Sequence, residues 1–155
     1  MAVVGSLNGL RRIILPQRSL NQIQQLLQPY FHACIENTNV FGDLPRRLQD
    51  YFMGNMTDFP DELDWGGVTP FQHAVWTTAR GIPHGEARSY SWLAKQINRK
   101  KAARAVGQAM RRNPWPIIVP CHRVLASNGG LGGFAGGLEM KRRLLEIERQ
   151  ALSRS

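Results

Sequence analysis

The sequence predicts an α/β (α+β) protein built as a small N-terminal α/β domain, residues 1–65, followed by a mainly helical C-terminal domain, residues 66–155. Three observations predict this class. A strand-like run and two amphipathic helical runs occupy the first part, helical periodicity dominates the second, and an acidic, turn-rich stretch at residues 55–67 lies between them. With 155 residues and 43% hydrophobic content, the chain can bury a substantial core.

The N-terminal part contains one predicted strand and two predicted helices. The run RRIILP is typical of a short strand, and residues 19–32 and 43–54 both show helical periodicity. Gly54 ends the second helical run. The apolar stripe of the first run comprises Leu20, Ile23, Leu26, Leu27 and Phe31, and that of the second comprises Leu44, Leu48 and Phe52.

The C-terminal part opens with a helix whose start is marked by an N-cap, Thr69, and a first-turn proline, Pro70. Phe71, Val75 and Thr78 share one face of this helix, which Gly81 ends. The run SYSWLAKQI predicts about two further helical turns, with Trp92, Leu93 and Ile97 facing inward.

Asn98 and Arg99 interrupt that helix, and a second short helix, AARAVGQAMRR, follows. Two short helices joined by a tight turn predict a helix-turn-helix. In the second helix, the residues expected to face the core are Ala103, Val106 and Met110. The expected basic face consists of Arg104, Gln108 and Arg111. The rest of the helix surface carries only small residues, namely Ala102, Ala105, Gly107 and Ala109. Such a slim helix either presses into a DNA groove without reading bases or simply packs closely against another helix.

The net charge of +9 is concentrated in one segment. Residues 80–123 hold 10 basic side chains and one acidic one, whereas residues 1–79 carry a net −2 and residues 124–155 a net +2. A concentrated basic segment favours a polyanionic partner, and nucleic acid is the commonest. The alternative is a solvated basic face.

The sequence shows no membrane span and no signal peptide. No apolar run approaches about 18 residues, and the start, MAVVGSLNGLRR, lacks a basic segment followed by an apolar one. A soluble cytoplasmic protein is therefore expected. The only cysteines, Cys34 and Cys121, form no CxxC pair, which excludes a four-thiolate zinc site.

The run IIVPCHRV presents a candidate nucleophile, Cys121, at the end of what reads as a buried strand, Ile117 to Pro120. A thiol needs a base or a cation to form thiolate at neutral pH, and His122 is the obvious base. Because neighbouring strand residues point to opposite faces, the pair requires a bend at Pro120, a water or a third residue. An inert buried cysteine beside a surface histidine is the alternative.

Two later segments can complete such a site. Glu148 shares the apolar stripe of the last helical run, GLEMKRRLLEIERQ, and a carboxylate on an apolar stripe is usually paired. The loop NGGLGGFAGG carries six glycines between positions 129 and 137 but lacks the GK[ST] ending of a phosphate-binding loop. It serves either as a flexible linker or as the wall of a pocket.

From about Asp43 to Glu148 the sequence resembles the O6-alkylguanine-DNA alkyltransferases, or methylated-DNA–protein-cysteine methyltransferases. The resemblance is carried by TPFQHAVW, IPHGEARSY, AARAVGQAMRRNP, IIVPCHRV and GGLGGFAGGLEMKRRLLEIE. It implies a winged helix-turn-helix in the C-terminal domain. It also implies a single-turnover enzyme that flips alkylated guanine, and O4-alkylthymine, out of DNA and moves the alkyl group irreversibly to Cys121.

The resemblance also assigns roles to residues. It implies catalytic roles for Cys121, His122, Glu148, Tyr90 and Asn113, with Arg104 filling the place of the flipped base. The implied DNA contacts are Arg104, Tyr90, Ser91, Arg99, Ala102, Gly107, Gln72 and Ser127, and the implied pocket residues are Pro116, Gly132, Phe134 and Ala135.

The implied partner is double-stranded DNA that contains alkylated guanine. The protein is expected to be a monomer, capable of cooperative assembly on DNA, that binds no membrane and needs no cofactor or metal. Three positions depart from the family pattern: the inter-helix turn reads NRKK, Phe134 replaces a common tyrosine, and Ala135 replaces a hydroxyl residue. The cysteine at position 121 argues against membership in the subgroup of relatives that carry tryptophan at that position and only bind lesions. A DNA-binding module without chemistry and a cysteine hydrolase are the rival functions.

Overall fold

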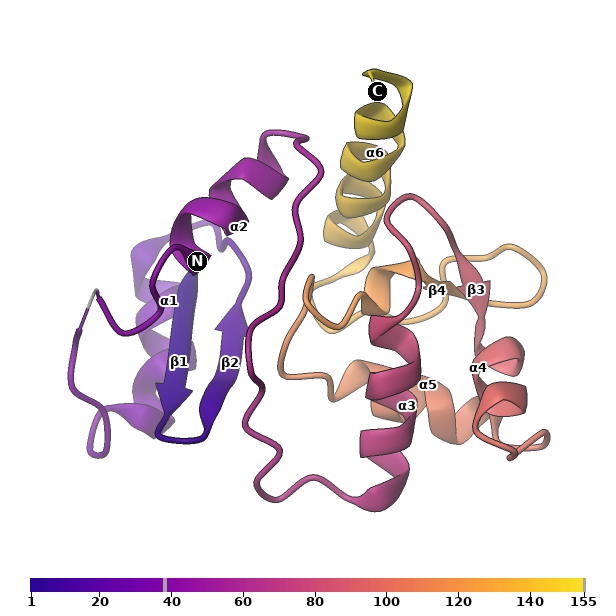
Figure 1. Ribbon diagram of the computed structural model, residues 1–155, viewed down its shortest axis with the longest axis horizontal. Helices are drawn as coiled ribbons and strands as arrows, with labels where there is room; N and C mark the ends of the chain where they lie inside the picture. The colour runs from indigo at the N-terminus through magenta and orange to yellow at the C-terminus, as the bar shows by residue number, and fades with distance from the viewer. Residues whose placement is uncertain (38, 155) are drawn as a thin grey trace.

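A computed structural model describes residues 1–37 and 39–154, and it shows the expected α+β architecture (Figure 1). The N-terminal part opens with an antiparallel hairpin of β1 (Ala2–Ser6) and β2 (Gly9–Ile14), irregular between Val4 and Gly5. The predicted strand is therefore the second of a pair, and it begins two residues earlier than the run RRIILP. The first strand was not predicted.

The two predicted N-terminal helices form, but they differ in burial. Helix α1 (Leu20–Leu27), continued by η1 (Gln28–Tyr30), buries none of its residues, and Leu20 on its apolar stripe is 78% exposed. Helix α2 (Leu44–Phe52) buries Leu44, Leu48 and Tyr51, while Phe52 is only half-buried. Tyr51, which was not part of the predicted apolar stripe, is therefore the third buried residue of α2.

The described residues of the C-terminal part form four α-helices and a short parallel pair of strands (Figure 1). They are α3 (Pro70–Arg80), β3 (Arg88–Ser89), α4 (Tyr90–Gln96), α5 (Ala103–Arg111), β4 (Val124–Leu125) and α6 (Leu138–Arg154). Thr69 and Gln72 form a reciprocal capping box at the start of α3. Asn98 takes the left-handed conformation, φ 57°, between α4 and α5, which confirms the predicted helix-turn-helix turn.

Helix α5 departs from the predicted burial in one respect. Val106 and Met110 are buried as expected, but Ala109 joins them in place of Ala103, which is half-buried. The indole Nε1 of Trp76 donates to the Ala109 carbonyl oxygen at 3.0 Å, so α3 packs directly on this turn of α5. Close helix packing therefore accounts for Ala109, whereas Arg104, Gln108 and Arg111 are exposed as predicted.

The strand predicted before Cys121 is wrong, although its residues, Ile117 to Pro120, are buried as expected. Residues 113–120 form a compact turn in which Ile117 has φ 79°, a conformation no strand residue adopts, and residues Cys121–Arg123 continue as the 3-10 helix η2. Asn113 holds this turn, since its Nδ2 donates to the Val119 carbonyl at 2.8 Å and its Oδ1 accepts from the Trp115 amide at 2.9 Å.

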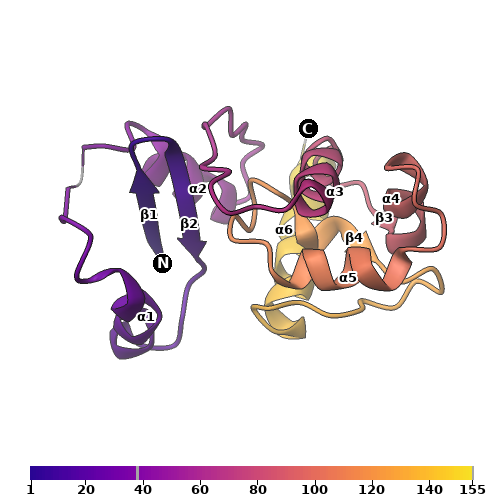
Figure 2. The same ribbon diagram turned by 90° about the horizontal axis from the view of Figure 1, so that it is seen from below.

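The two parts lie side by side and share one core (Figure 2). Trp115 Nε1 donates to the Leu10 carbonyl oxygen at 2.7 Å, and the Ile13 amide donates to the Pro114 carbonyl oxygen at 2.8 Å. The stretch between the two parts, residues 55–67, is also bonded to the hairpin, because the Asp64 carboxylate accepts hydrogen bonds from Ser6 at 2.7 Å and from Arg11 at 2.8 Å. These bonds anchor the hairpin to the turn that carries Cys121.

Candidate active site and nucleic-acid interface

Cys121 begins η2 and is 6% exposed, at the junction of the Asn113 turn and α6. Burial raises the pKa of its thiol, while the Asn113 side chain and then the Lys141 ammonium oppose that rise. The resting sulfur is therefore a neutral thiol with two groups placed to stabilise its anion. Cys34, the other cysteine, is exposed.

His122 is fully buried and lies 2.6 Å, Nε2 to Oε1, from Glu148 of α6. Burial lowers the pKa of His122, so its ring is neutral. Since an ionised carboxylate can only accept, Nε2 carries the ring proton and Nδ1 presents a free lone pair. Among the residues that the structure describes, nothing hydrogen-bonds to Nδ1. Cys121 and His122 follow each other in the 3-10 helix η2, so they do not alternate between two faces as strand residues would.

Glu148 is held by several donors at once. Arg123 donates to it from Nε at 2.9 Å and from Nη2 at 2.8 Å, and the Gly85 amide donates at 2.9 Å. Burial alone would raise the pKa of Glu148, but the hydrogen bonds from His122 and Arg123 outweigh it and keep that pKa well below its usual range. Glu148 is therefore a permanent anion that fixes the His122 tautomer.

Two further residues belong to this site and were not predicted. Lys141 of α6 is 0% exposed, and its Nζ donates to the backbone oxygens of Val124 at 2.6 Å and Leu131 at 2.5 Å. Burial lowers the pKa of Lys141 to about 8. Tyr51 of α2 donates from Oη to Glu148 Oε1 at 2.7 Å. Lys141 lies seven positions before Glu148 on one face of α6, a spacing that could have revealed it.

Tyr90, the first residue of α4, sits against the glycine-rich loop and α5. Its hydroxyl donates to the Gly133 carbonyl oxygen at 3.3 Å, and the Lys141 ammonium lies 5.8 Å from the centre of its ring. A Cβ atom at Gly132 would approach the Tyr90 hydroxyl to 2.7 Å, so only glycine fits there. The loop therefore packs against Tyr90, and its predicted role as the wall of a pocket stays a prediction.

The helix-turn-helix presents a basic face. Its exposed cations are Lys95, Arg99, Lys100, Lys101, Arg104, Arg111 and Arg112. The Ser91 and Ser127 hydroxyls lie 3.1 Å apart, which places the loop after β4 next to α4. Two arginines of the basic segment serve the fold instead: Arg123 pairs with Glu148, and Arg80 donates to the Phe59 and Asp61 carbonyls.

The remaining predicted positions are distributed around this arrangement. Ala102 precedes α5 and is half-buried, as is Gly107 within it, while Gln72 is engaged in the capping box of α3. Pro116 is buried in the Asn113 turn, Phe134 is half-buried and Ala135 is exposed in the glycine-rich loop. The geometry brings Cys121, His122, Glu148, Tyr90 and Asn113 to one region, with the basic face of α5 beside it.

Comparison with known proteins agrees with this geometry. Residues 70–150 match the family model of the 6-O-methylguanine DNA methyltransferase, DNA binding domain. The chain belongs to this methyltransferase family. It is 43% identical over 132 residues to the methylated-DNA–protein-cysteine methyltransferase of Mycolicibacterium paratuberculosis, a match that covers 85% of this chain and 79% of the relative.

Solved methyltransferase structures share the fold. The crystal structure of Mycobacterium tuberculosis OGT in complex with DNA superposes with a TM-score of 0.80 at 39% identity, covering 96% of this chain and 86% of that one. The O6-methylguanine-DNA methyltransferase of Pyrococcus kodakaraensis gives a TM-score of 0.70 at 32% identity, covering 94% and 88%. The family and the α+β fold predicted from sequence are thereby confirmed.

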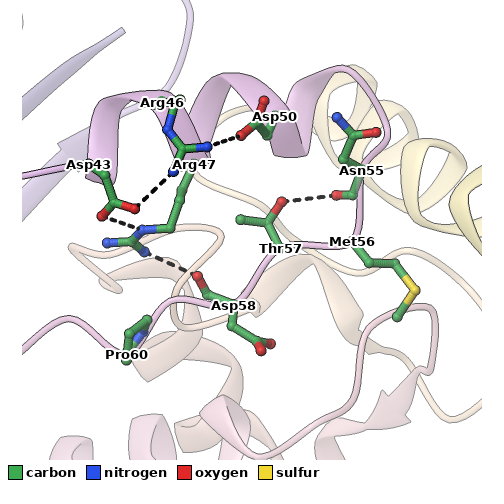
Figure 3. Close-up of a pocket in the computed structure, with 9 residues that line it drawn as sticks. All are labelled: Asp43, Arg46, Arg47, Asp50, Asn55, Met56, Thr57, Asp58 and Pro60. Atoms are coloured by element: carbon green, nitrogen blue, oxygen red, sulfur yellow. Dashed lines mark hydrogen bonds and ion pairs between the residues drawn. The ribbon is translucent and has the colours of Figure 1, made fainter.

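Two surface hollows of this methyltransferase family member lie among the described residues away from Cys121, which lines neither of them. One, about 510 Å³, lies on α2 and the stretch after it, and Figure 3 shows its ion pairs between Asp43, Arg46, Arg47 and Asp50. The other, about 520 Å³, lies between residues 57–60 and 80–84 and reaches Arg123.

Within residues 1–37 and 39–154 of this methyltransferase family member, no three His, Cys, Asp or Glu side chains gather as metal ligands would. Over the same residues, no helix combines the length and apolar character that crossing a bilayer requires.

Proposed function

We propose that the protein repairs O6-alkylguanine in DNA by transferring the alkyl group permanently to Cys121. The observation that carries this proposal is the buried Cys121–His122–Glu148 arrangement directly beside an exposed basic helix-turn-helix. A DNA-binding module without chemistry would not need an anion, Glu148, buried against a neutral imidazole. A cysteine hydrolase would not need the basic face of α4 and α5.

The chemistry follows from the protonation states of the resting site. His122 Nδ1, acting through water, takes the thiol proton, and the resulting thiolate is stabilised by Lys141 and Asn113. The sulfur attacks the alkyl carbon in line, so a C–S bond forms as the C–O6 bond breaks. The bonding pair passes to the guanine, which takes a proton from the Tyr90 hydroxyl. Water does not hydrolyse a thioether, so the thiol is not regenerated and each molecule reacts once.

Access to a buried thiol requires the damaged base to leave the helix stack. Arg104 is exposed near the start of α5, where it can enter the space left by the base. A Cβ atom added at Gly107 would lie 3.9 Å from the Tyr90 ring, so this turn of α5 is a close neighbour of Tyr90. The other proposed DNA contacts are Ser91, Arg99, Ala102, Gly107, Gln72 and Ser127.

A mass measurement tests the proposal. Incubation with duplex DNA carrying O6-methylguanine should replace one hydrogen by one methyl group on the peptide that contains Cys121, and the Cys121→Ser variant should bind the lesion but gain nothing. An unmodified Cys121 peptide after prolonged incubation, alongside tight lesion binding, would support a binding module instead. Repeated turnover of an ester substrate would support a hydrolase.

The same proposal extends to several properties. Duplex carrying O4-methylthymine is expected to modify the same peptide. The protein is proposed to act in the cytoplasm as a monomer that can assemble cooperatively on DNA, with residues 1–65 and 66–155 as its domains. The cytoplasmic location is supported by two cysteines that form no disulfide.

A further inference from the structure

We propose that Tyr51 of the N-terminal part is a positioning residue of the active site, holding Glu148 so that His122 stays neutral and able to accept the thiol proton. This inference rests on the proposed alkyl transfer to Cys121. It gives the N-terminal part a direct role in the chemistry in addition to structural support.

The geometry places the Tyr51 hydroxyl inside the His122–Glu148 pair. Its Oη is 2.7 Å from Glu148 Oε1 and 3.2 Å from His122 Nε2, and the residue is 1% exposed. The ring is held by edge-on aromatic contacts, with centroids 5.7 Å from Phe52 and 6.1 Å from Phe59. A side chain packed this way has one orientation, so its hydroxyl is a fixed part of the site.

The direction of the hydrogen bond follows from the charges. Glu148 is ionised and can only accept, and burial followed by the Glu148 charge raises the pKa of Tyr51 well above its usual value. The phenol therefore stays protonated and donates to Glu148 Oε1, the same oxygen that accepts the His122 proton. Arg123 Nη2 also donates to this oxygen, at 2.8 Å, and each donor that shares the oxygen receives less of its charge.

Removing the hydroxyl should therefore strengthen the hold of Glu148 on the His122 ring. Glu148 would remain ionised, because Arg123 and the Gly85 amide still donate to it. With one donor fewer on Oε1, the carboxylate would favour the protonated imidazole more strongly, and a protonated imidazole cannot accept the thiol proton. The charged and titratable groups around His122 are Glu148 and Lys141 from α6, Arg123 and Cys121 from η2, Tyr51 from α2, and His84 from the loop before β3.

Helix α2 delivers Tyr51 through a rigid set of anchors. Leu44 and Leu48 are buried on the same face, and Arg47 donates to both oxygens of Asp61 at 2.8 Å. Tyr51 and Glu148 are 97 positions apart in the chain, so the contact exists only when the N-terminal part is docked. The active site thus draws a hydrogen-bond donor from outside the segment that matches the family's DNA-binding domain.

The test compares Tyr51→Phe with wild type in single-turnover methyl transfer from duplex DNA containing O6-methylguanine. Phenylalanine keeps the ring contacts and removes only the hydroxyl. The acid limb of the pH–rate profile should move up by about one unit, so that transfer below that limb is about tenfold slower. Affinity for the duplex should be unchanged. Leu48→Val, one turn earlier on the buried face of α2, is the matched control and should leave the acid limb in place.

The outcomes separate this inference from the proposed function. A wild-type protein that gains no methyl group would refute alkyl transfer itself. If the wild type reacts and the Tyr51→Phe profile coincides with it, Tyr51 has no positioning role. The same conclusion follows if Leu48→Val moves the acid limb equally, because general loosening of α2 would then explain the shift.

Discussion

Lys141→Met tests whether a buried ammonium is held beside the nucleophile at a cost in stability. Lys141 is 0% exposed, and both of its hydrogen-bond partners are backbone oxygens rather than carboxylates. Burial lowers the pKa of Lys141 from 10.5 to about 8, and the electrostatic interaction with Cys121 offsets only part of that drop. Methionine has a similar length and no charge, so it removes the titration while keeping the volume.

The magnitude follows from the difference between the folded and unfolded pKa of Lys141. A drop from 10.5 to about 8 corresponds to about 3 kcal/mol. Between these values the unfolded chain holds the proton and the folded protein does not, so the free energy of unfolding rises with pH in this window. Below pH 8 the cost of the buried charge is fully present. Lys141→Met should lose this dependence.

The assay is urea unfolding at a series of pH values in a Cys121→Ser background, which removes the thiol titration. From pH 8 to pH 10.5 the unfolding free energy of the parent should gain about 3 kcal/mol relative to Lys141→Met. Arg142→Met, the exposed neighbour on α6, is the control and should run parallel to the parent. Parallel curves for Lys141→Met and the parent would refute the argument, because Lys141 would then titrate alike in the folded and unfolded states.

Three other perturbations probe the same site and surface. Glu148→Gln leaves Arg123 buried without its anion and should lower the unfolding free energy by about 3–5 kcal/mol in urea; an unchanged midpoint would contradict the pairing. Arg104→Ala should slow methyl transfer from duplex far more than reaction with the free modified base, and an equal loss on both would remove its assigned role. Duplex affinity, measured by fluorescence anisotropy, should fall steeply with salt, whereas a flat dependence would argue against phosphate contacts.

Local patterns predicted the helix-turn-helix well because each signal there is short-range. Asn98 tolerates the left-handed conformation, and the structure uses it for that purpose between α4 and α5. The apolar run from Ile117 to Pro120 misled because periodicity alone cannot distinguish a strand from a buried turn. The bonds of Asn113 to Val119 and Trp115 decide in favour of the turn, and they depend on the tertiary fold.

The active site was only partly predictable for a related reason. Cys121, His122 and Glu148 stand out by residue type, and Lys141 shares the face of α6 that carries Glu148. Tyr51, in contrast, looks like an ordinary helix residue until its partners are known. Tyr51 meets His122 across 71 positions and Glu148 across 97. Sequence periodicity shows which face of a helix is apolar, but the partner of a buried polar atom depends on how the helices dock.

The protonation states of the buried site suit a protein that reacts once. Burial keeps the Cys121 thiol neutral at rest, and its 6% exposure limits contact with dissolved electrophiles. Lys141 and Asn113 counter only part of the burial effect. Further burial of the sulfur would strengthen the attraction between a thiolate and the Lys141 ammonium, but it would also raise the cost of removing the anion from water. Because burial is the largest influence on the thiol, Lys141 and Asn113 alone do not ionise Cys121, and formation of the thiolate requires a base such as His122.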